Sequence, residues 1–149
     1  MDIAIKPATM SQPQISIKKK LNHPIDKVWR ALTDKEALSE WLMETGGFEL
    51  SPGYTFQFKT TPRGKFDGIV DCKIKSVDAP YHLQYSWRAK GMAQATIVTW
   101  SLRSIEDHAT ILTLTHDGFV GIDGWLTKTM LHFGWKRLLS KKLNNYLTL

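Results

Sequence analysis

The side chains best suited to chemistry in this sequence are five histidines and one cysteine. His116 and Asp117 are neighbours in an alternating segment, so their side chains point to opposite faces of a strand and cannot pair directly. The histidines lack the close helical pairing that zinc sites use. The sequence has no nucleophile elbow, phosphate-binding loop or dinucleotide fingerprint. It therefore predicts no catalytic residues, no metal site and no cofactor.

Aromatic side chains are the other candidates, because they concentrate in the segments expected to form strands and the last helix. Together with a few polar groups they could line a small-molecule pocket. The candidate ligand-binding residues are Tyr54, Phe56, Phe66, Tyr85, Trp87, Arg88, Trp100, His116, Trp125, His132 and Trp135. For most of them individually, the favoured interpretation is an ordinary core residue, and as a set they could line a pocket. Both interpretations stay open, because either face of each strand could line the interior.

Length and composition indicate one domain with a substantial core, since the chain has 149 residues and 42% of them are hydrophobic. The sequence lacks a membrane-spanning run and the apolar region of a secretory signal, so we expect a cytoplasmic protein without membrane insertion. Its net charge of +6 raises the question of nucleic acid. Lys18, Lys19 and Lys20 lie in an alternating segment and so cannot all point one way, and the basic residues of the last helix lie on its polar side. We therefore expect a solvated surface and no nucleic-acid partner.

Hydrophobic spacing divides the chain into a flexible polar lead, residues 1–13, and one domain, residues 14–149. A first strand is expected to end near Leu21. Residues 23–42 carry two short apolar stripes at helical spacing, and Thr33 and Glu36 have the spacing of a capping box at the start of the second helix. We expect Trp29 and Trp41 to be buried in this helix pair.

Alternation resumes after Gly46 and Gly47 and continues for about seventy residues, which predicts an antiparallel meander. The last segment, residues 124–147, has helical spacing, and strands followed by a separate helix are typical of an α+β fold. Its two apolar stripes are out of phase, and they consist of Leu126, Met130 and Phe133, then Trp135, Leu139 and Leu143. We therefore expect a bend or a change of packing partner at Gly134, with the earlier stripe covering either a cavity mouth or a second subunit.

This order of elements resembles the helix-grip fold of the START-like (SRPBCC) superfamily, which includes the birch pollen allergen, polyketide cyclases and lipid-transfer domains. The matching motifs are "HPIDKVWRALTDKEALSEWL", "SPGYTFQF", "FDGIVDCKIKSVDAPYHLQYSW", "TIVTWSL", "ATILTLTHDGF" and "GWKRLLSKKLNNYL". They are most similar to the branch named for the homologue of the heat-shock-protein ATPase activator. The resemblance implies a curved antiparallel sheet of about six or seven strands around a long C-terminal helix. Two short helices would lie between the first two strands and close one end of the sheet.

Three functions follow from the resemblance. The first is a module that binds a hydrophobic small molecule, such as a lipid or a polyketide-like aromatic, between the sheet and the long helix. The second is a cyclase-like or aromatase-like enzyme, for which His116 or Arg88 is the nearest proton-transfer candidate. The third is a protein-interaction module with a chaperone as its partner, and a homodimer is a further possibility for the apolar stripe of the last helix.

Overall fold

The computed structural model describes residues 14–149, so the predicted lead of residues 1–13 lies outside the described residues. The fold is α+β, as the sequence predicts. Its elements are β1 (Ile15–Leu21), α1 (Ile25–Thr33), α2 (Lys35–Trp41), β2 (Glu44–Thr45), β3 (Thr55–Lys59), β4 (Ile69–Asp78), β5 (His82–Ala89), β6 (Thr96–Ile105), β7 (Ala109–Asp117), α3 (Gly121–Arg137), a π-helical turn (Leu138–Lys142) and α4 (Leu143–Leu147).

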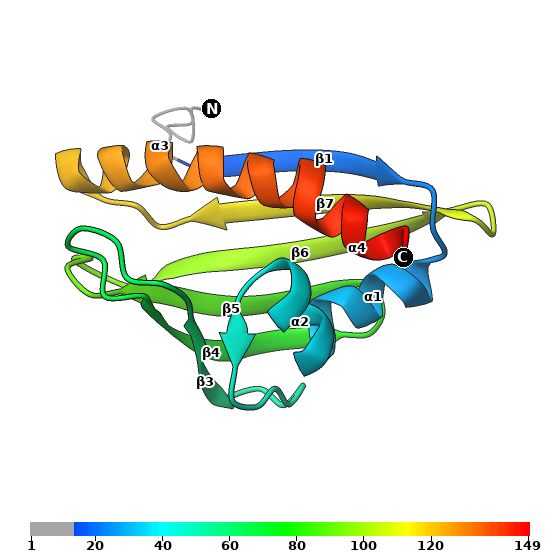
Figure 1. Ribbon diagram of the computed structural model, residues 1–149, viewed down its shortest axis with the longest axis horizontal. Coiled ribbons are helices and arrows are strands. Elements are labelled where there is room, and N and C mark those ends of the chain that lie inside the picture. The colour runs from blue at the N-terminus through cyan, green and yellow to red at the C-terminus, as the bar shows by residue number, and fades with distance from the viewer. Residues whose placement is uncertain (1–13) are drawn as a thin grey trace, which may run out of the picture.

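The strands form one antiparallel sheet in the order β1-β7-β6-β5-β4-β3-β2. The register of β4 against β5 shifts between Ile74 and Ser76, and such an irregularity bends a strand. The C-terminal helical segment runs along the sheet beside β1 (Figure 1). Helices α1 and α2 lie near α4, at the C-terminal end of that segment. This arrangement is the helix-grip architecture that the resemblance implies.

The second strand differs from the sequence expectation. Strand β2 precedes the glycine pair instead of following it, and residues 46–54 form no strand. The hydroxyl of Thr45 donates a hydrogen bond to the carbonyl of Gly47 over 2.8 Å, which turns the chain there. Phe48 therefore packs against the core from a loop.

The two short helices form as predicted, but the cap between them is different. The carboxylate of Asp34 accepts a hydrogen bond from the backbone N–H of Ala37 over 3.2 Å, and so Asp34 is the N-cap of α2. The hydroxyl of Thr33 instead donates to the carbonyl of Trp29 over 2.8 Å. The prediction of a capping box between Thr33 and Glu36 is therefore wrong, because Thr33 still belongs to α1.

The tryptophans of the helix pair have different environments. Trp41 is buried, and its indole N–H donates to the carbonyl of Ala31 over 2.7 Å, which joins α2 to α1. Its ring also meets the ring of Trp100 on the sheet at a centroid distance of 6.1 Å. Trp29 is only half-buried. Trp41 is thus the residue that closes this end of the sheet, while Trp29 packs against the outside of the core.

The C-terminal helical segment passes through Gly134 without a break. The packing changes there as expected, because the apolar stripe before Gly134 is exposed and the stripe that begins at Trp135 is buried. The irregularity comes later, in the π-helical turn, where the N–H of Leu143 bonds to the carbonyl of Leu138. Leu126, Met130 and Phe133 are exposed, and they do not cover a cavity mouth. Their side of α3 points away from the face that carries the buried Trp135.

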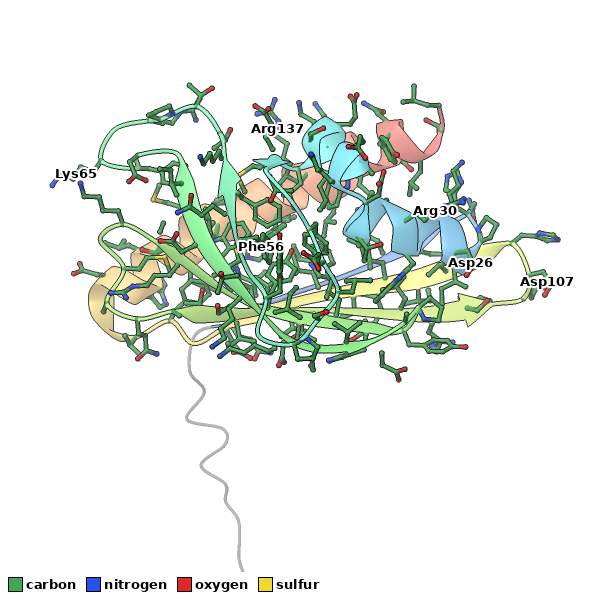
Figure 2. The ribbon with its side chains drawn as sticks, turned by 90° about the horizontal axis from the view of Figure 1, so that it is seen from below. Asp26, Arg30, Phe56, Lys65, Asp107 and Arg137 are labelled. Carbon is green, nitrogen blue, oxygen red and sulfur yellow. The ribbon has the colours of Figure 1, made fainter. Side chains whose placement is uncertain are left out.

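The core fills the space between the sheet and the helices, where the side chains of both layers interlock and Phe56 lies near the centre (Figure 2). Lys27 of α1 donates a hydrogen bond from its Nζ to the carbonyl of Leu147 over 2.6 Å. This contact holds the end of α4 against the helix pair. None of the helices in residues 14–149 has the length and hydropathy to cross a bilayer.

Candidate functional site

The centre of the candidate site is His116 on β7, a polar side chain that is fully buried among aromatic rings. The indole N–H of Trp135 donates to its Nδ1 over 3.0 Å, so in the neutral ring the proton resides on Nε2. That Nε2 lies 2.7 Å from the hydroxyl of Thr96. The Thr96 hydroxyl in turn donates to the carbonyl of Trp87 over 2.8 Å. Every polar atom of this chain of contacts has a partner, and the chain joins three strands to the helix.

The charge of His116 follows from its burial. Burial lowers the pKa of the imidazole from 6.5 to about 3, so the ring is neutral at physiological pH. Protonation would also place an N–H on Nδ1 opposite the N–H of Trp135. His116 is thus held as one neutral tautomer, in the same way as a structural hydrogen-bonding group.

Aromatic rings surround this polar contact on the side of the sheet that faces the helix. Trp135 lies between Trp87 and Trp100, at centroid distances of 5.2 and 5.5 Å. The indole N–H of Trp100 donates to the hydroxyl of Tyr85 over 2.9 Å, and burial raises the pKa of that phenol. Rings at these distances are in contact, so the layer between sheet and helix is packed in this structure.

A small opening reaches this layer from the surface. It has a volume of about 70 Å³ and lies between the β5–β6 loop and the start of α3. Thr96, Met92 and Phe119 are among the residues that line it. The ring of Phe119 is buried, and its centroid lies 4.7 Å from the centroid of the His116 ring. Phe119 therefore separates the opening from the interior.

Phe119 lies in a short connection without regular secondary structure, between β7 and α3. Gly118 and Gly121 flank this connection, and both have positive φ values, +97° and +69°, which favour glycine. A Cβ on Gly124 would come within 3.1 Å of the Phe119 backbone, so a glycine is needed for α3 to start close to Phe119. The glycines thus position Phe119 over the His116 layer.

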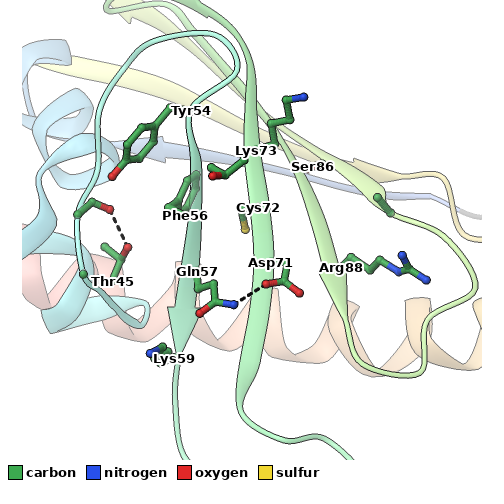
Figure 3. Close-up of a pocket in the computed structure, with 14 residues that line it drawn as sticks. Thr45, Tyr54, Phe56, Gln57, Lys59, Asp71, Cys72, Lys73, Ser86 and Arg88 are labelled. Atoms are coloured by element: carbon green, nitrogen blue, oxygen red, sulfur yellow. Dashed lines mark hydrogen bonds between the residues drawn. The ribbon is translucent and has the colours of Figure 1, made fainter.

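A second concave region lies on the other face of the sheet (Figure 3). It is an open groove of about 690 Å³ across β3, β4 and β5, and Tyr54, Phe56 and Arg88 are among its lining residues. The amide of Gln57 donates to the carboxylate of Asp71 over 2.7 Å on its floor. The remaining charged lining residues are Lys59 and Lys73. Its exposed, mixed-charge floor is typical of a solvated sheet face.

The structure brings together six of the candidate binding residues in or beside the packed aromatic layer, namely Phe56, Tyr85, Trp87, Trp100, His116 and Trp135. It does not bring the others there. Arg88 follows the inward Trp87 and so faces the outer groove, and Tyr54 lines that groove at its edge. Phe66 is half-buried in the β3–β4 connection. Trp125 is exposed on α3, and His132 is half-buried there beside Phe133.

Thr96 and Phe119 are not among the binding residues that the sequence predicts. Phe119 could have been noticed in "HDGFVG", where two glycines bracket a large aromatic residue between a strand and a helix. Thr96 gave no signal, because its hydroxyl matters only through contacts with residues distant in the sequence. Within residues 14–149, no three His, Cys, Asp or Glu side chains gather in a way that could hold a metal ion.

Comparison with solved structures finds other proteins that have this fold. A structure of a Mesorhizobium loti protein, MLL2253, superposes with a TM-score of 0.79 over 91% of this chain and 96% of its own, at 24% identity. CalU16 from Micromonospora echinospora gives a TM-score of 0.74 over 90% of this chain and 73% of its own, at 24% identity. DynU16, from the dynemicin biosynthetic locus, gives 0.74 over 91% of this chain and 47% of its own, at 22% identity. These likenesses show the fold.

The curated proteins gave no match to the chain. A protein family, in contrast, matches nearly all of the described domain, over residues 22–148. The matched range runs from just after β1 to the end of α4, and so it includes the helix pair, the meander and the C-terminal helical segment. The chain therefore belongs to the family of Activator of Hsp90 ATPase homolog 1-like proteins.

Proposed function

We propose that the chain binds an apolar, aromatic small molecule between the sheet and α3, in the space that Phe119 fills in this structure. The observation that carries the proposal is the position of Phe119, a plug between a surface opening and a buried aromatic layer. Displacement of one phenyl ring would join the opening of about 70 Å³ to His116 and the rings beside it.

Phe119 is the ring of this layer best placed to move. Trp87 and His116 belong to strands, and Trp135 belongs to a long helix, so their backbones are fixed by regular hydrogen bonding. The backbone of Phe119 lies outside these elements between two left-handed glycines. A connection of this kind can change its dihedral angles at low steric cost.

The chemistry of the vacated space would select a flat, apolar ligand. Trp87 and Trp135 would offer ring faces and edges, which favour aromatic partners. The hydroxyl of Thr96 would offer a polar contact beside the opening. A mostly aromatic lining with a few polar groups is the usual composition of a small-molecule site. One structural neighbour comes from a biosynthetic locus, which supports a natural-product ligand by analogy only.

The cyclase-like alternative has less support from the geometry. A general base near neutral pH needs a pKa close to the working pH and a free nitrogen facing the substrate. The pKa of His116 is far below that range, and both of its nitrogens have partners. Arg88 lies on the opposite face of the sheet. A chaperone partner has support only from the description of the family.

Tryptophan fluorescence can test the proposal, because two indoles would line the site. Titration with flavonoids, polyketide-like aromatics and fatty acids should give a saturable change for some aromatic members. We expect dissociation constants in the micromolar range, about −8 kcal/mol of binding free energy. Native mass spectrometry of the purified protein should show the same ligands retained.

Substitutions at Phe119 make the test specific. Phe119→Leu should speed association, because a smaller plug opens more easily, and Phe119→Trp should block binding while the protein stays folded. Phe133→Ala removes an exposed ring of the same type and is the matched control, with binding unchanged. Binding that is unaffected by both Phe119 variants would contradict the proposed site. A complete absence of fluorescence response across the panel would contradict the proposed function.

A further inference from the structure

The outward side of α3 carries three large apolar residues that the rest of the described chain does not cover. Leu126, Met130 and Phe133 are 54%, 75% and 71% exposed. Their spacing of four and three residues places them on one side of a regular helix. We call these residues the α3 stripe. Contiguous apolar surface of this kind on a protein is typical of an interaction site.

Two charged residues lie at the ends of the α3 stripe. Asp123 precedes Met130 by seven residues and Arg137 follows it by seven, and both are exposed. Seven residues are close to two helical turns, so both charges lie on the same side of α3 as Met130. The stripe therefore has a negative charge at one end and a positive charge at the other, at equal distances from its centre.

Gly134 lies beside the α3 stripe, and no contact within residues 14–149 explains why a glycine stands there. It is exposed in the middle of a helix, where glycine is less favourable than alanine. A Cβ at this position would meet nothing within 4 Å. A small residue is useful there if another helix approaches closely from outside.

We propose that a second copy of this chain covers the α3 stripe, with the two α3 helices antiparallel about a two-fold axis at Met130. In this arrangement Met130 meets Met130 of the second copy, and Leu126 meets Phe133 of the second copy. Asp123 faces Arg137 of the second copy, so the symmetry produces two opposite-charge pairs. Gly134 forms the small flank that lets the helices approach.

The charges and the symmetry favour a second copy over other occupants. An unrelated apolar segment would have no reason to match a negative and a positive end that are equidistant from the centre. The same-chain alternative is residues 1–13, since β1 begins beside α3. The stripe is short, so the dimer should be weak, with a dissociation constant on the order of 10 to 100 µM.

Sedimentation velocity of the full chain tests the proposal across concentrations from about 1 µM to 1 mM. The wild type should shift from monomer to dimer. Met130→Glu should weaken the dimer about tenfold or more, because it places two carboxylates at the two-fold axis. Tyr81→Glu, which adds the same charge at an exposed aromatic residue on another surface, should leave the dimer unchanged. A wild type that stays monomeric throughout would overturn the proposal.

Charge exchange tests the antiparallel geometry. Asp123→Arg and Arg137→Asp should each weaken the dimer about tenfold by creating like-charge pairs. The double variant should regain the wild-type dissociation constant to within about threefold, because both pairs are then restored in reverse. Failure of this rescue would overturn the two-fold arrangement.

Gly134→Ala should raise the melting temperature of the dilute monomer and weaken the dimer.

Deletion of residues 1–13 distinguishes the occupants. A dimer of unchanged strength in the shortened chain agrees with the proposal. A chain that dimerises only after this deletion would show that residues 1–13 cover the α3 stripe, and the proposal would then be wrong.

Discussion

The two halves of the C-terminal helical segment have similarly apolar sequences but opposite environments. After Gly134 the large apolar residues Trp135, Leu139, Leu143 and Leu147 are all buried. Before it, the three residues of the α3 stripe are exposed. The difference shows that apolar content does not by itself predict burial in this segment. The decisive property is whether the apolar spacing stays in phase with the surface of the sheet.

Helix geometry explains how the second half stays in phase. Its buried residues recur every four positions, and in a regular α-helix each such step rotates a side chain by about 40°. Over three steps the stripe would leave the sheet. The π-helical turn contains one more residue than an α-turn, shown by the bond from the Leu143 N–H to the Leu138 carbonyl. The extra residue cancels the drift, so Leu143 and Leu147 still face the core.

Tryptophan replacement should give the largest contrast between the halves. We expect Trp135→Ala to lower the free energy of unfolding by about 3–5 kcal/mol, because it opens a cavity and leaves Nδ1 of His116 without its donor. Trp125→Ala in the exposed half should cost less than about 1 kcal/mol. Urea unfolding of dilute samples measures both. Equal losses would mean that the exposed half packs against something within the monomer.

The pH dependence of unfolding should also distinguish the halves. The pKa of His116 is about 3 in the folded chain and 6.5 when unperturbed, so the unfolded chain binds the proton more readily. The stability contributed by neutral His116 is complete above pH 6.5 and is lost as the pH falls towards 3. We expect a loss of about 2 kcal/mol at pH 5.

Two variants check that this loss belongs to His116. Urea unfolding at a series of pH values should show a shallower slope for His116→Gln, which removes the titrating ring. Trp125→Ala changes an exposed, non-titrating side chain in the first half of the helix and should leave the slope unchanged. A steep slope that persists in His116→Gln would assign the pH dependence to other groups.

Deletion of Ser140 should have the smallest effect. The residue is exposed within the π-helical turn, and its removal should produce a regular α-helix in which Leu143 follows Trp135 by seven positions. The free energy of unfolding, measured by thermal melting, should then change by less than about 1 kcal/mol. Deletion of Thr129 is the matched control and should cost more, because it rotates Gly124 away from Phe119 by about 100°. Equal costs would contradict this role of the π-helical turn.

The sequence by itself determined the order of strands and helices, because alternation and helical spacing are local properties. It also determined the resemblance to the helix-grip family, which the matched range confirms. Local patterns were less reliable at boundaries. The predicted capping box was wrong because the carboxylate of Asp34, one residue after Thr33, accepts the backbone hydrogen bond at the start of α2. Strand β2 came before the glycine pair because Thr45 turns the chain there.

Only the tertiary structure decided which candidate residues share one environment. Alternation separates Trp87 from Arg88, but it does not say which face receives the helix. The contacts of His116 join residues 19 and 20 positions apart in the sequence, and no local pattern encodes them. The exposure of the α3 stripe likewise depends on where α3 meets the sheet. Burial is a property of two surfaces in contact, whereas periodicity describes one of them.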